Sequence, residues 1–193
     1  MATKYGKRTL KQIKPVRLKS GKEAIVRPAQ VRDALVIANL SQEELLEAGA
    51  LDITLSEEFK AIVAQLEERL PGYKIEDGKA FFVAEIAGEV IGMVHFENSN
   101  DEMQMHQGTF GMAVKKAWRD QGVGRALLQS LLAWGKSDPL IEKIRLEVFS
   151  NNERAISLYK SLGFVEEGRL VKQLKLNRGE YVDFILMYRF VNK

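Results

Sequence analysis

The stretch RDQGVGRALL, residues 119–128, places two glycines directly before a run of leucines. The spacing continues at Leu131 and Leu132, which is typical of the buried face of an α-helix. A glycine turn that opens a helix can bind phosphate, because the first helical turn presents unpaired N–H groups at the positive end of the helix dipole. The stretch therefore predicts a turn and a helix, with a phosphate site as one use of the turn.

The segments around this turn alternate between strand and helix patterns. GTFGMAV at 108–114 and KIRLEVF at 143–149 predict strands on either side of a helix at 122–136. Strand, helix and strand in this order form a βαβ unit with two parallel strands. Elsewhere the patterns predict two short strands within 16–29, helices at 30–40 and 56–70, a hairpin at 80–97 and a strand at 182–190.

A short helix is expected between the strand at 143–149 and the strand at 182–190. Ser150 is its predicted N-cap, and Glu153, three residues on, completes a capping box. Gly163 follows as the residue that ends the helix. Taken in order, the elements predict an α+β fold with a mixed, mostly antiparallel sheet flanked by helices.

Composition limits the possible classes. The 193 residues are 46% hydrophobic and 28% charged, which suits one domain, with a basic N-terminal arm or hairpin at 1–23 and a core at 24–190. There is no cysteine and only two histidines, so neither disulfides nor a metal site is expected. No run approaches the roughly 18 apolar residues of a membrane span, and the N-terminus lacks the apolar segment of a signal peptide. We expect a cytoplasmic protein with no membrane partner.

The glycine turn does not match any of three known nucleotide-binding patterns. A dinucleotide fingerprint needs a third small residue where Leu127 stands. A P-loop needs Gly-Lys-Ser/Thr at its end, and a kinase glycine loop needs a catalytic loop downstream. Both of those features are missing, so on the turn alone a simple helix start stays open as the alternative.

The sequence around the turn resembles the Gcn5-related N-acetyltransferase family. The family's pyrophosphate loop, [Q/R]-x-x-G-x-[G/A], is matched from Arg119 to Gly124, and a later L-E-V, Asn, A-x-x-x-Y-x-x-x-G-F pattern is matched between 146 and 164. The resemblance implies a sheet splayed at the cofactor-binding strand and acetyl-CoA as acyl donor. It also implies a cofactor site made by the strand end and the loop, namely Met112, Ala113, Val114, Arg119, Asp120, Gln121, Gly122, Val123, Gly124, Arg125, Ala126 and Asn152.

Two chemical roles follow from the resemblance and from side-chain chemistry. Tyr159 is the predicted general acid, because a phenol with a pKa of about 10 is protonated at neutral pH and can protonate a leaving thiolate. Asn152 stands where the family binds the cofactor through a side-chain amide. Core packing for Tyr159 and helix capping for Asn152 are the structural alternatives.

The general base is less well defined. Many relatives carry a glutamate in the strand before the loop, where this sequence has Thr109. Others, including ribosomal-protein alanine acetyltransferases, use the Glu of L-E-V, and Glu147 has the matching spacing to Asn152 and Tyr159. Glu147 is therefore the predicted base, and Glu97 and His106 acting through water are the other candidates.

The distribution of charged residues along the chain suggests which kind of partner the protein binds. Residues 41–70 hold eight acidic residues against Lys60 and Arg69, so they form either solvated helix faces or a surface that attracts a cationic amine. Such an acceptor would be a polyamine, an aminoglycoside or a protein N-terminus. Residues 1–27 carry nine Lys/Arg and one Glu, but no aromatic residues are interleaved as stacking platforms, which argues against nucleic acid.

The sequence thus predicts an N-acetyltransferase that moves an acetyl group from acetyl-CoA to a primary amine by direct attack. Two alternatives remain, a catalytically silent acetyl-CoA sensor and a nucleic-acid-binding module led by the basic arm. A homodimer stays open as the assembly.

Overall fold

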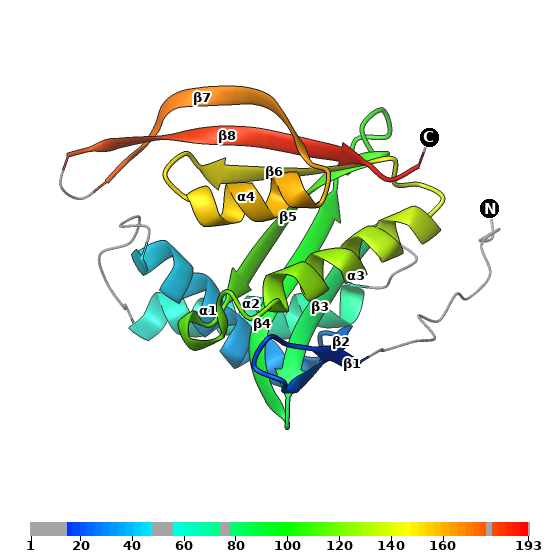
Figure 1. Ribbon diagram of the computed structural model, residues 1–193, viewed down its shortest axis with the longest axis vertical. Coiled ribbons are helices and arrows are strands. Elements are labelled where there is room, and N and C mark those ends of the chain that lie inside the picture. Colours follow the sequence, from blue (N-terminus) through cyan, green and yellow to red (C-terminus); the bar gives the residue numbers. More distant parts are fainter. Residues whose placement is uncertain (1–14, 48–55, 74–77, 177–178, 193) are drawn as a thin grey trace.

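The computed structural model describes residues 15–47, 56–73, 78–176 and 179–192. Within them, eight strands form one sheet in the order β1-β2-β3-β4-β5-β6-β8-β7 (Figure 1). Their bounds are β1 Pro15–Arg17, β2 Glu23–Pro28, β3 Lys79–Ile86, β4 Glu89–Asn98, β5 Gln107–Val114, β6 Lys143–Phe149, β7 Val165–Lys175 and β8 Tyr181–Phe190. Every neighbouring pair is antiparallel except β5 and β6, which are parallel. The predicted mixed, mostly antiparallel sheet is confirmed.

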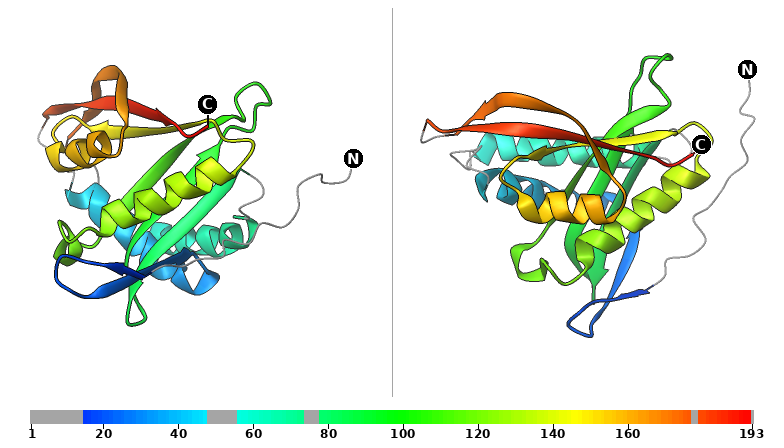
Figure 2. Two further views of the ribbon diagram at one scale, coloured as in Figure 1. Left: turned by 45° about the vertical axis from the view of Figure 1, so that its right-hand side comes forward. Right: turned by 45° about the horizontal axis from the view of Figure 1, so that its top comes forward.

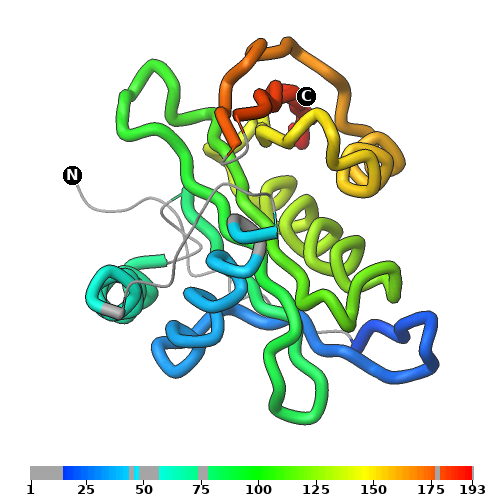
Figure 3. Tube along the Cα trace, turned by 90° about the vertical axis from the view of Figure 1, so that its left-hand side faces the viewer, coloured from blue at the N-terminus to red at the C-terminus, as the bar shows by residue number. Residues whose placement is uncertain are grey.

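The helices cover both faces of this sheet. They are α1 Ala34–Glu47, α2 Ser56–Arg69, α3 Val123–Ser137 and α4 Glu153–Ser161, with short 3-10 turns at Val31–Asp33, Leu70–Gly72 and Lys116–Trp118. Figure 3 shows α1 and α2 on one side of the central strands and α3 on the other. Among the described residues, none of these helices combines the length and apolar character that a membrane crossing needs.

Each sheet face has its own core because strand side chains alternate between faces. On β3, Phe82 packs with the α3 core, whereas its neighbours Phe81 and Val83 pack with α1. The α3 core is centred on Leu127, Leu131 and Trp134, all fully buried. The leucine run that begins at Leu127 therefore forms the buried face predicted for it.

The predicted βαβ unit is β5, α3 and β6, and its two parallel strands stay paired for only part of their length. The pairing is Gln107–Lys143, Gly108–Ile144 and Thr109–Arg145, although β5 continues to Val114 and β6 to Phe149. Figure 2 shows the two strands diverging beyond this point. The expected splay of the sheet is thus present, and it begins after Thr109.

Two local predictions need correction. The N-cap of α4 is Asn152, whose side chain accepts a hydrogen bond from the backbone N–H of Ala155 at 3.2 Å, so Ser150 does not cap this helix. Strand β7 was not predicted, because most of its residues are exposed and its apolar side chains do not alternate regularly. It forms the sheet edge beside β8.

Candidate active site

A cavity of about 400 Å³ opens where β5 parts from β6. Its walls come from the end of β5, the loop and first turn of α3, one face of α4, one residue of the β1–β2 turn and two residues of α1. The lining residues are Lys19, Leu40, Glu43, Met112, Ala113, Val114, Arg119, Asp120, Gly122, Gly124, Arg125, Asn152, Arg154, Ala155, Ser157, Leu158, Tyr159 and Ser161. Most of the residues predicted for cofactor binding therefore surround one space.

Three of the predicted cofactor residues do not line the cavity: Gln121, Val123 and Ala126. Val123 and Ala126 have side chains buried in the α3 core, and the carbonyl of Gln121 accepts a hydrogen bond from the backbone N–H of Lys19. The backbone N–H of Ala126 donates to the Gly122 carbonyl at 3.0 Å, so this group is not free to contact a ligand.

Glycine is needed at the two loop positions, 122 and 124, for different structural reasons. Gly122, the N-cap of α3, has a φ of 100°, a left-handed conformation that is costly for residues with a side chain. A Cβ on Gly122 would meet nothing within 4 Å, so the backbone angle is what requires glycine there. At Gly124 a Cβ would lie 3.2 Å from Leu158 Cδ2, so this glycine allows α3 to approach α4.

Positive groups surround the loop and are held in place. Arg119 donates from Nε to the Val114 carbonyl at 3.1 Å and pairs with Glu47 of α1 at 2.5 Å. Arg125 donates to Ser161 Oγ at 2.7 Å. These arginines stand beside the N-terminus of α3, whose first N–H groups have no partner within an α-helix. The arrangement suits an anionic group such as a pyrophosphate.

Tyr159 lines the same cavity from α4. Its side chain is only 7% exposed, and its ring makes edge-to-face contacts with Phe110 and Phe164 at centroid distances of 5.7 and 6.0 Å. Aromatic packing on two sides fixes the ring against rotation away from the cavity. Tyr159 therefore has a packing role and also lines the cavity.

Glu147 lies outside the cavity lining and is exposed. Its neighbours Leu146 and Val148 are buried in the α3 core, so Glu147 is on the opposite sheet face, as alternation predicts. The predicted base therefore has its carboxylate open to solvent and outside the cavity lining.

The other two candidate bases have structural partners. Glu97 accepts hydrogen bonds from Tyr73 and Arg69 at a second cavity of about 400 Å³. Burial, and then the hydrogen bond to Glu97, raise the pKa of the Tyr73 phenol. His106 lies just before β5, and its carbonyl accepts from the N–H groups of Glu142 and Lys143. Neither Glu97 nor His106 lines the cavity at the splay.

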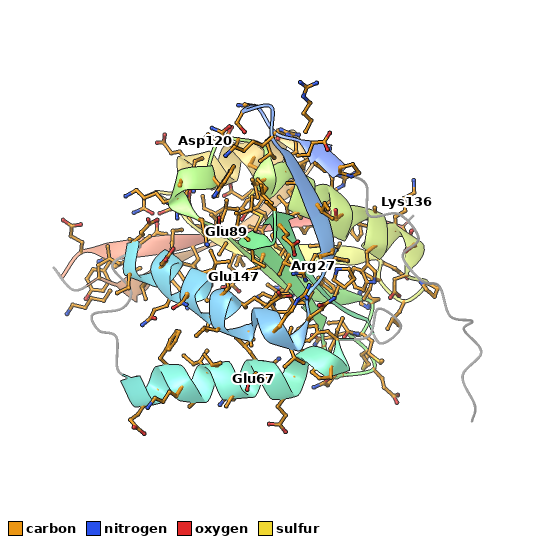
Figure 4. All side chains as sticks on the ribbon, turned by 90° about the horizontal axis from the view of Figure 1, so that it is seen from below. Arg27, Glu67, Glu89, Asp120, Lys136 and Glu147 are labelled. Atoms are coloured by element: carbon orange, nitrogen blue, oxygen red, sulfur yellow. The ribbon has the colours of Figure 1, made fainter. Side chains whose placement is uncertain are left out.

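The acidic residues of the 41–70 segment lie in different surroundings. Glu43 lines the cavity, Glu47 pairs with Arg119, and Glu57, Glu58, Glu67 and Glu68 are exposed on α2. Figure 4 shows α1 between α2 and the strands, with Glu67 labelled on α2. Asp52 lies outside the described residues, and so does the side chain of Glu44. Solvation explains the α2 group, whereas Glu43 lies in the cavity lining.

A family model described as the acetyltransferase (GNAT) family matches residues 48–164, more than half of the chain. The chain belongs to this family. As a GNAT protein it is an N-acetyltransferase whose acyl donor is acetyl-CoA. The matched segment includes the splayed strand, the glycine loop and Tyr159, so the family assignment and the cavity concern the same part of the molecule.

Relatives of this GNAT protein extend over most of its length. It is 29% identical to the L-amino acid N-acetyltransferase AaaT of Escherichia coli over 86% of this chain and 98% of that protein. It is 30% identical to an N-alpha-acetyltransferase of Sulfurisphaera tokodaii, covering 86% and 90% of the two chains. Its fold matches the acetyltransferase yncA of Salmonella typhimurium, solved with acetyl-CoA, with a TM-score of 0.73 at 21% identity, over 88% and 95% of the two chains.

Proposed function

We propose that the protein transfers an acetyl group from acetyl-CoA to a primary amine by direct attack, in a complex that holds both substrates. The observation that carries the proposal is the cavity at the splay, which has the glycine loop at one end and Tyr159 in its wall. The chain has no cysteine to accept the acetyl group as a thioester, which favours direct attack over a covalent acetyl-enzyme.

The residues of the cavity divide the binding of acetyl-CoA between them. In this proposal the first-turn N–H groups of α3 bind the pyrophosphate together with Arg119 and Arg125, which line the cavity. The edge of β5 from Met112 to Val114 continues past its last pair with β6. Its outward-facing backbone groups, apart from the Val114 carbonyl that accepts from Arg119, are therefore available to pair with the amide groups of the pantetheine arm, as an added strand would. Asn152 caps α4 and lines the cavity, so its side-chain amide has both a structural role and a ligand role in this proposal.

The chemistry requires proton transfers on both sides of the thioester. The amine nitrogen attacks the acetyl carbon, and the carbon–sulfur bond breaks as the tetrahedral intermediate collapses. Tyr159 donates its phenolic proton to the leaving thiolate. On the other side, the carboxylate of Glu147 accepts a proton from the ammonium form of the acceptor, so that a free lone pair can attack. Exposure keeps Glu147 accessible to such an acceptor.

The acceptor in this proposal is a primary amine of a small molecule or of a protein N-terminus. Relatives of the chain include acetyltransferases named for L-amino acids, N-alpha positions and spermidine, all of which carry amines. Glu43 at the cavity and Glu147 beyond the splay add negative charge near the expected path of the amine. We therefore expect a cationic amine to be preferred over a neutral one of similar size.

A panel of amines tests this function. Purified protein is mixed with acetyl-CoA and with L-amino acids, spermidine or a peptide with a free N-terminus, and thiol release is followed together with the mass of the product. N-blocked forms of the same compounds are the matched controls. We expect thiol release that depends on a free amine. Binding of acetyl-CoA without amine-dependent release from any compound would favour the silent sensor instead.

A further inference from the structure

His95 is a polar side chain of β4 on the face of the sheet that α1 covers. It alternates with Val94 and Phe96 of the α3 core and shares the face of Met93, which packs with α1. Its ring lies 5.5 Å from the ring of Phe81, and its Nδ1 atom is buried without a hydrogen-bond partner. A buried polar atom without a partner is costly, and packing alone does not explain why it is kept.

The imidazole reaches over the neighbouring strand at a glycine. His95 pairs with Gly111 in the β4–β5 ladder, and a Cβ on Gly111 would lie only 2.5 Å from His95 Nε2. The ring therefore occupies the space that a side chain at position 111 would need. In consequence the imidazole leans from β4 over β5 at Gly111, with Nε2 the ring atom nearest to that glycine.

This place is the start of the splay. Thr109 pairs with Arg145, and the same parallel register carried two residues further would set Gly111 opposite Glu147. Gly111 and Glu147 do not pair, because the strands have already parted. His95, Gly111 and Glu147 therefore follow one another in a row across the same sheet face, with the opening of the sheet between the last two.

Proton balance sets how many protons must leave the attacking nitrogen. An ammonium group has three N–H hydrogens and the product amide has one, so two protons leave the nitrogen for each acetyl group transferred. One leaves before attack, and the other leaves the positively charged nitrogen of the tetrahedral intermediate. Tyr159 returns only one proton, to the thiolate, so one proton in total goes to solvent.

We propose that His95 is a catalytic residue of this reaction, which accepts the second proton from the attacking nitrogen at Nε2 while Glu147 accepts the first. The inference rests on the acetyl transfer proposed above. The intermediate's nitrogen is a stronger acid than the starting ammonium, because it is bonded to the acyl carbon. A neutral imidazole is therefore sufficient to take its proton. Gly111 is the residue that gives Nε2 access to it.

The surroundings keep this imidazole neutral. Burial lowers the pKa of His95 below its usual 6.5, Glu97 opposes this effect and Arg69 adds to it. Tyr73, which bonds to Glu97, is the other titratable group of this cluster. An imidazole that is uncharged at neutral pH is ready to accept a proton. The ring then returns this proton to solvent easily, because the pKa of the imidazole is low.

Two variants test the proposal with the amine that the panel identifies. His95→Gln keeps a polar side chain but has no basic nitrogen, so kcat should fall by about 10²-fold, with the Kd of acetyl-CoA unchanged. Gly111→Ala should cause a similar loss, because its Cβ displaces the imidazole. Gly168→Ala on β7 is the matched control, since a Cβ there meets only Leu186 at 3.8 Å, and it should keep the wild-type rate.

The outcomes separate this proposal from the function on which it rests. If the wild type releases no thiol with any amine, the proposed function itself fails. If the wild type is active and a folded His95→Gln matches its rate and its pH profile, His95 is only a packing residue. Rescue of His95→Ala by added imidazole would support proton transfer, because a purely structural role would not respond to a free base. If His95→Ala loses activity, melts at a lower temperature than the wild type and is not rescued by imidazole, the proposal is also overturned.

Discussion

At the scale of single residues, Tyr159 shows how packing and chemistry depend on different atoms of one side chain. The ring contacts Phe110 and Phe164, whereas proton donation would depend on the hydroxyl alone. Tyr159→Phe keeps the ring and removes the proton. We expect turnover to fall by about 10²–10⁴-fold, with little change in acetyl-CoA affinity by calorimetry. A Phe variant that turns over at the wild-type rate, with chemistry rate-limiting, would restrict Tyr159 to packing.

Gly122 is the residue whose backbone shape the phosphate loop most directly requires. Alanine at φ 100° is strained by roughly 1–2 kcal/mol, and relaxation of that strain would move the N–H groups of the loop. We therefore expect Gly122→Ala to weaken acetyl-CoA binding measurably. Gly88→Ala is the matched control, because Gly88 has a φ of 87°, equally open surroundings and a place in the β3–β4 turn. Equal affinities in the two variants would contradict a role for the loop.

At the scale of elements, a buried ion cluster joins β2 to the turn before α1 and to β3. Arg27 donates to Asp33 at 2.7 and 2.9 Å and to Glu85 at 2.7 Å (Arg27 is labelled in Figure 4). Burial alone would raise the pKa of Asp33, but the hydrogen bonds from Arg27 and from the N–H of Gln30 outweigh burial and lower it. The cluster thus positions α1, which supplies Leu40 and Glu43 to the cavity.

Removal of the Arg27 guanidinium should destabilise the fold where β2, β3 and the turn before α1 meet. Arg27→Met leaves the Asp33 carboxylate buried without its partner, and we expect a loss of about 3 kcal/mol in the free energy of unfolding at pH 7. Because the folded pKa of Asp33 is lowered, its stabilisation is present above its usual value of 3.8 and is lost as the pH falls through the folded pKa. Lys115→Met, which breaks the exposed pair with Glu89, is the control and should cost about 0–1 kcal/mol. Similar denaturation midpoints would contradict the structural role of the cluster.

Elements with a strong periodic pattern could be predicted from the sequence, and those defined by their neighbours could not. Helix α3 and strand β6 carry regular apolar spacing, and their predicted bounds agree with the structure to within one residue. Strand β7 is an edge strand held by its pairing with β8, so its residues need no regular apolar face. Ser150 and Glu153 have the spacing of a capping box, which predicts Ser150 as the cap, but the first helical turn begins at Glu153 and makes Asn152 the N-cap.

At the scale of the whole molecule, the candidate site depends on where one sheet divides. The glycine loop and Tyr159 could be predicted because each belongs to a local motif. His95 was not predicted, since its position over Gly111 depends on the register between two strands and on the absence of one side chain. The exposure of Glu147 also could not be read from its strand, because alternation gives the face and not what covers it.

The central claim, direct attack by an amine on acetyl-CoA held at the splay, is tested most directly by initial rates of thiol release. Both acetyl-CoA and the best amine of the panel are varied. Because both substrates must be bound together, we predict double-reciprocal lines that intersect, and no acetyl group on the protein after incubation with acetyl-CoA alone. Parallel lines together with a protein that gains one acetyl group in the absence of amine would contradict the account.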